Sequence, residues 1–152
     1  MTVATSNSHP RVKLAINQAY ALDENGQSAL AVSQLTTLLE EFPDSSALHA
    51  YLSWFLRSER RLEEAVVHSR QAIELSPRSE KASLSYFYAL WDCAKYIEAL
   101  DEMARLLKIR PSEIYSDIIK DWKLDEDGDE VEDDPTQRGD ALDGAENTAP
   151  GD

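Results

Sequence analysis

The feature that most constrains this chain is a period of 34 residues. Three prolines stand at that interval, Pro43, Pro77 and Pro111. Small and apolar positions keep the same interval: Ala31, Ala65 and Ala99; Leu22, Leu56 and Leu90; Val32, Val66 and Leu100; Leu39, Ile73 and Leu107. A fixed period of this length is typical of arrays of helical hairpins, in which each unit buries its apolar face against its neighbours. The chain is therefore predicted to be a repeat protein, and proteins of that kind usually hold other macromolecules.

Each unit reads as a helix, a short turn and a second helix. We expect helices over residues 12–23 and 27–41, 46–57 and 62–75, and 80–91 and 96–109. Asn25 and Gly26 are expected to end the first helix of the first unit, because both residue types tolerate positive φ. Each proline follows a second helix, which it prevents from continuing. Ser45 and Ser79 are expected to cap the helices that follow.

One more amphipathic helix is expected over residues 112–123, where Ile114, Ile118 and Trp122 fall on one stripe. A repeat array needs such a helix to cover its last apolar face, so we interpret it as a cap. Docking of a partner on this helix is the alternative.

The chain is predicted to consist of one ordered domain between two disordered ends. Residues 125–152 carry −11 of the formal net charge of −14 and almost no branched apolar or aromatic side chains. Such a composition cannot bury enough surface to offset chain entropy, so an acidic disordered tail is expected there. Residues 1–9 are expected to be disordered as well. The ordered domain would span residues 10–124, with repeats over about 12–45, 46–79 and 80–113.

Residues 12–113 resemble the tetratricopeptide repeat (TPR) family. The second unit matches the family pattern best, at Leu52, Ser53, Leu56, Ala65, Ala72 and Pro77. The resemblance implies an all-α solenoid of helical hairpins, with about seven helices once the cap is counted. The first unit departs from the pattern at Leu38, which replaces a late alanine. The third has Phe87 at a small position and Leu106 at the late alanine, so its two helices are expected to sit further apart or in a different register.

The resemblance also implies a superhelix whose concave face is lined by the first helix of each unit. Carried over by position, the candidates for partner contact on that face are Ile16, Tyr20, Trp54, Arg57, Lys81, Leu84, Tyr88 and Trp91. Tyr20, Trp54 and Tyr88 occupy the same position in successive units and are expected to stack as an aromatic ladder. Large rigid aromatics of this kind dominate many binding interfaces. The alternative is that these side chains serve mainly in packing, since Trp and Tyr are often largely buried.

The sequence offers little that could support catalysis. His9, His49 and His68 are expected to lie far apart in the array, without a second ligand at metal-binding spacing. Cys93 has no neighbouring His–carboxylate pair to activate it. We therefore expect no catalytic residue, no metal site and no cofactor, and the chain is not expected to be an enzyme.

The remaining sequence features narrow the class of partner. An acidic chain without a basic patch argues against nucleic-acid binding, and no apolar run is long enough to cross a membrane. A single cysteine and the lack of a secretory signal favour the cytoplasm. We expect an adaptor or scaffold that holds a peptide or a partner protein in its groove. The alternative is a stoichiometric inhibitor, of the immunity or antitoxin type, that neutralises a basic partner. An oligomer is possible but has no support in the sequence.

Overall fold

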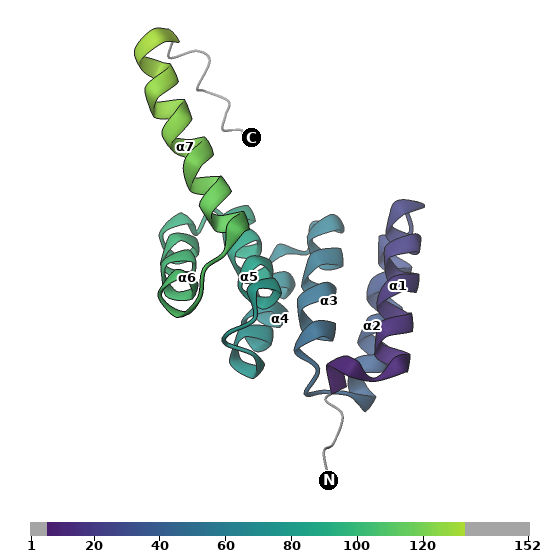
Figure 1. Ribbon diagram of the computed structural model, residues 1–152. Helices are drawn as coiled ribbons and strands as arrows, with labels where there is room; N and C mark the ends of the chain where they lie inside the picture. The colour runs from purple at the N-terminus through teal and green to yellow at the C-terminus, as the bar shows by residue number, and fades with distance from the viewer. Residues whose placement is uncertain (1–5, 133–152) are drawn as a thin grey trace. The chain divides into compact units, whose positions relative to one another are not determined.

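The computed structural model describes residues 6–132, and these residues form helices joined by short turns (Figure 1). A 3₁₀ helix comes first, followed by α-helices: η1 Ser6–Ser8, α1 Pro10–Glu24, α2 Ser28–Glu41, α3 Ser46–Ser58, α4 Leu62–Leu75, α5 Glu80–Asp92, α6 Tyr96–Ile109 and α7 Glu113–Glu132. For residues 6–132 the predicted all-α class with about seven helices is confirmed. Among the described residues, none of the helices is both long enough and apolar enough to cross a membrane.

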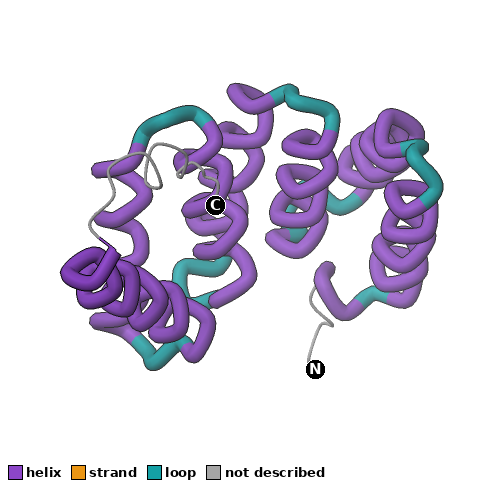
Figure 2. The backbone as a smooth tube through the Cα atoms, turned by 90° about the horizontal axis from the view of Figure 1, so that it is seen from above, coloured by secondary structure: helices purple, strands orange, loops and turns teal. Residues whose placement is uncertain are grey.

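The described residues fall into two units, an array that ends at Ser112 and the helix α7 that follows it. In the array the three hairpins α1–α2, α3–α4 and α5–α6 stand side by side (Figures 1 and 2). The first helices contact one another directly, α1 with α3 and α3 with α5, whereas the second helices make no comparable contact within this unit. The layer of first helices is therefore the tighter one, and the array curves towards it.

Every hairpin of the array turns by the same hydrogen-bonded motif. The residues at its centre have positive φ and lie 34 residues apart: Gly26 (77°), Arg60 (60°) and Ala94 (61°). In each turn the next residue donates its N–H to the carbonyl of the in-register leucine, Leu22, Leu56 or Leu90, at 2.8–2.9 Å. This is a Schellman motif, which satisfies the last carbonyls of a helix and sends the chain back alongside it. The sequence showed a suitable residue only at Gly26.

The in-register alanines explain how closely the helices approach. Ala31, Ala65 and Ala99 are each 0% exposed, near the start of the second helix of their hairpin. Next to Ala65, the buried Ser53 donates its hydroxyl hydrogen to the Ala65 carbonyl at 2.9 Å. Such contacts leave no room for a larger side chain at these positions.

The third hairpin keeps the register of the other two, despite the predicted departure at Phe87. Its turn makes the same hydrogen bonds, and Leu90 and Ala99 are fully buried. Phe87 is accommodated because its ring stacks on Trp91, with centroids 5.5 Å apart and planes 24° apart. The bulk of Phe87 is therefore taken up by a neighbouring ring rather than by a shift of the helix.

Residues 6–9, the described part of the segment expected to be disordered, are ordered, because Asn7 ties η1 to the start of α3. Its side-chain oxygen accepts hydrogen bonds from the Ser45 hydroxyl (2.7 Å) and the Ala47 N–H (2.9 Å). Its amide nitrogen donates to the Ser46 hydroxyl at 2.8 Å. Ser45 itself accepts from the Leu48 N–H, so α3 receives two side-chain caps, one of them from a residue far away in sequence.

The last helix is longer than the predicted segment 112–123, since α7 continues to Glu132. The sequence interpretation ended it where the acidic run begins. Leu124 and the three glutamates of the added segment favour a helix, whereas its aspartates and Gly128 do not, so helix propensity alone does not account for the extension. Most of the predicted acidic tail, residues 133–152, lies outside the described part of the chain. The predicted role of this helix as a cap stays a prediction.

The positive φ in the shared turn predicts that replacing alanine by glycine changes the stability in opposite directions inside the turn and in the middle of a helix. Ala94→Gly should stabilise the array by ~0.5–1 kcal/mol, because glycine adopts the left-handed conformation without steric cost. Gly26→Ala should destabilise it by ~1 kcal/mol for the same reason. The control is Ala104→Gly in the exposed face of α6, which should cost ~1 kcal/mol of helix propensity. Urea unfolding of the variants measures all three, and destabilisation by Ala94→Gly would contradict the turn assignment.

Candidate functional site

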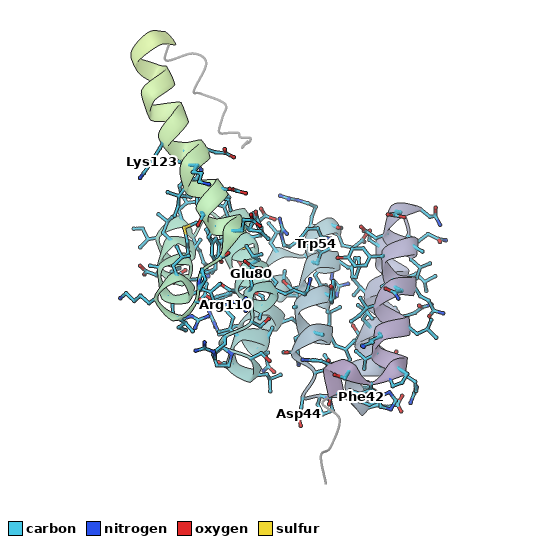
Figure 3. All side chains as sticks on the ribbon, in the orientation of Figure 1. Phe42, Asp44, Trp54, Glu80, Arg110 and Lys123 are labelled. Atoms are coloured by element: carbon cyan, nitrogen blue, oxygen red, sulfur yellow. The ribbon has the colours of Figure 1, made fainter. Side chains whose placement is uncertain are left out.

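The first helices place most of the predicted site residues at one face of the array, but not all of them at its surface. Ile16 is only 8% exposed and belongs to the core. Tyr20 and Trp54 remain 37% and 41% exposed; Trp54 projects from α3 (Figure 3). Lys81 on α5 is exposed, and the three remaining candidates on that helix, Leu84, Tyr88 and Trp91, are half-buried. The face is therefore partly surface and partly packing.

The central feature of this face is Arg57, whose guanidinium lies against two of the predicted aromatics. Its Cζ atom is 5.4 Å from the centre of the Trp54 ring and 5.2 Å from that of Tyr88. Its Nε donates to the Asp92 carboxylate at 2.7 Å, and both side chains are about three-quarters or more buried. Arg57 thus joins the second repeat to the third by a charge-assisted hydrogen bond and by cation–π contacts. Asp92 was not among the predicted site residues.

Tyr20 makes a different set of contacts from those expected of an aromatic ladder. Its ring meets Tyr51 and Phe55 edge-on, each with a centroid separation of 5.5 Å. The Lys81 ammonium lies 4.9 Å from the centre of the Tyr51 ring, on the side of the third repeat. Trp54 and Tyr88 are therefore linked through Arg57 rather than by stacking on one another, and Tyr20 contacts Tyr51 and Phe55 instead. Sequence analysis missed Tyr51, because the residues 34 positions before and after it, Asn17 and Ser85, are not aromatic.

The phenols on this face stay neutral. Burial raises the pKa of the Tyr20 hydroxyl, and the neighbouring Tyr51 adds to that rise. Burial also raises the pKa of the Tyr88 hydroxyl, although the charge of Arg57 opposes it. Both groups ordinarily ionise near pH 10, so they remain hydrogen-bond donors at neutral pH.

Trp91 belongs to a packing cluster at the end of α5. It stacks on Phe87 and meets Tyr96 at 4.8 Å with the ring planes 67° apart. Since Tyr96 begins α6, this cluster joins the two helices of the third hairpin. The Trp91 ring therefore packs within the third hairpin, as the alternative interpretation of these aromatics expected.

The prediction that the histidines lie far apart is wrong for two of them. His49 on α3 and His68 on α4 face each other, with 3.1 Å between their Nδ1 atoms and 5.3 Å between their ring centroids. The two nitrogens thus point at each other along the line between the rings, which suits an N–H···N hydrogen bond. In the described part of the chain no group of three or more metal-binding side chains gathers.

The described architecture is that of a TPR domain, and comparison with solved structures agrees. A mutant form of MamA superposes with a TM-score of 0.57 and 20% identity, covering 70% of this chain and 78% of that one. The Sgt2 TPR domain from Aspergillus fumigatus superposes with a TM-score of 0.66 and 16% identity, covering 83% of this chain and 87% of that one. At these identities the likeness establishes the fold. No protein-family model matches the sequence, and no curated protein matches it significantly.

The geometry around Arg57 predicts that this residue matters for stability more than a surface arginine does. Arg57→Met keeps the aliphatic packing but removes the charge, and should cost ~1–3 kcal/mol because it leaves the largely buried Asp92 carboxylate without its partner. Arg61→Met is the matched control, since Arg61 and Glu64 form an exposed ion pair that solvent screens, so that its loss should lower the stability much less. Chemical unfolding of both variants measures the difference. Equal losses would show that the Arg57 contacts do not hold the two repeats together.

Proposed function

We propose that this chain is a protein-interaction module that binds an extended or helical peptide segment across the face formed by α1, α3 and α5. The proposal rests mainly on the arrangement around Trp54. A large indole stays 41% exposed beside an arginine that is already held in place. Rigid aromatics next to arginine are the residues that contribute most to binding energy in interfaces, because little entropy is lost when they are covered.

Arg57 supports the proposal because only part of its hydrogen-bonding capacity is used. Its Nε bonds to Asp92, while no hydrogen bond within the described residues occupies its two terminal nitrogens. Peptide carbonyls and carboxylates are suitable acceptors for these donors. The guanidinium is already oriented by Trp54 and Tyr88, so a partner would not have to order it.

The alternative function, inhibition of a basic partner, is supported by charge rather than by geometry. The chain has a formal charge of −14, most of it after residue 124. Such a charge would accelerate encounter with a basic protein, and salt would weaken the effect. The two functions differ in the surface they use, because binding by the acidic segment would not depend on Trp54.

Selection of peptides from a displayed random library on the immobilised full-length chain tests the proposal. Enriched peptides should lose at least about thirtyfold in affinity for the Trp54→Ala variant, which corresponds to a hot-spot loss of ~2 kcal/mol. The control is Val67→Ala, because Val67 is also an exposed apolar residue (55%) but lies on α4, in the other layer of helices.

Peptide affinities are compared only for variants whose far-ultraviolet circular dichroism spectrum matches that of the unchanged chain. If the peptides bind Trp54→Ala and Val67→Ala as tightly as they bind the unchanged chain, the proposed face is contradicted. If those peptides are also strongly basic and are released by salt, the inhibitor function is favoured instead.

A further inference from the structure

The two facing histidines lie in the central repeat and connect three segments of the array. His49 is 5% exposed on α3, and its Nε2 lies 3.2 Å from the Pro43 carbonyl in the connection between α2 and α3. Its Nδ1 lies 3.1 Å from Nδ1 of His68 on α4. One chain of hydrogen bonds therefore runs from the end of the first repeat through α3 to α4.

The partners fix which nitrogens carry hydrogen. A carbonyl oxygen can only accept, so His49 Nε2 must be the protonated nitrogen and must donate to Pro43. The neutral His49 ring then has a lone pair on Nδ1, and His68 Nδ1–H must donate to it. Protonation of His68 at its other nitrogen preserves this bond. Protonation of both rings places two N–H groups against each other and destroys it.

The surroundings do little to stabilise a second positive charge. The charged groups that act on the pair are Glu64 and Arg61, both at the start of α4. They already form an ion pair with each other, at 2.6 Å. The connection between α2 and α3 contributes only the Pro43 carbonyl, which His49 occupies.

We propose that the His49–His68 pair is an acid-sensitive latch, which holds the central repeat together at neutral pH and releases it when both rings are protonated. The position is important because the units of a solenoid are stabilised by their neighbours, and the central unit has one on each side. Loosening α3 against α4 would therefore weaken the coupling between the first and third repeats as well.

The direction of the pH dependence follows from the burial of the pair. Burial lowers the pKa of His49, and burial together with the nearby His49 ring lowers the pKa of His68. An unfolded histidine titrates near pH 6.5, so just below that pH the unfolded chain binds more protons than the folded one. The stability that the pair confers is fully present above about pH 6.5 and is lost as the pH falls through the lowered values.

Nuclear magnetic resonance of the full chain tests the bond and the titration without any substitution. A scalar coupling across the hydrogen bond should join Nδ1 of His49 to Nδ1 of His68 at neutral pH. Both rings should titrate below the pH of about 6.5 at which an unfolded histidine titrates. Absence of the coupling, together with titration of both rings at about pH 6.5, would overturn the proposal.

Thermal unfolding between about pH 7.5 and 5 tests the consequence for stability. His68→Gln retains an N–H donor for His49 but cannot be protonated, so unfolding should take up about one proton fewer than in the unchanged chain. The control is His9→Ser, in which serine replaces His9 as the N-cap of α1 and the pH dependence should be retained. An unchanged pH dependence in His68→Gln would refute the latch; should that variant fail to fold, the resonance titration decides.

Discussion

The array depends on one local constraint, the left-handed residue that ends each first helix. The chain that leaves α1, α3 or α5 must reverse within three residues. A single residue with positive φ makes this possible, because two backbone N–H groups of the turn can then donate to carbonyls in the last turn of the helix. At two of the three turns a side chain accepts the strain of that conformation, at Arg60 and Ala94. Because the turns are alike, the helices that follow meet their partners in the same register.

That register decides which side chains reach the surface of the first-helix layer. Positions facing between the helices are filled by small residues, such as Ala65 and Ser53, and the chain can therefore pack its helices closely there. The positions facing away carry Tyr20 and Trp54, which remain more than a third exposed, and Tyr88, which is half-buried. Arg57 and Tyr51 lie between them and connect neighbouring repeats, so the same contacts that stabilise the array also orient the surface proposed for binding.

The sequence predicts the features that recur at the period, and it misses those that occur once. Helix positions and the buried alanines follow from the 34-residue spacing, since each is required in every unit, whereas the candidate face came from the resemblance to the TPR family. The turn at Ala94 was not recognisable, because alanine gives no sign of positive φ. The His49–His68 pair joins residues 19 apart on two helices, a separation that no local motif marks. The cap by Asn7 and the pairing of Arg57 with Asp92 likewise depend on side chains that only the folded array brings together.

The central claim is that one turn geometry, repeated every 34 residues, builds the array and the face proposed for binding. Backbone resonance measurements on the labelled chain test it most directly, through the φ angles of Gly26, Arg60 and Ala94. The account predicts positive φ at all three, seen as a strong contact between the amide and α hydrogens within each residue. Negative φ at Arg60 or Ala94 would show that the hairpins turn in different ways, and would contradict the shared register on which the proposed face depends.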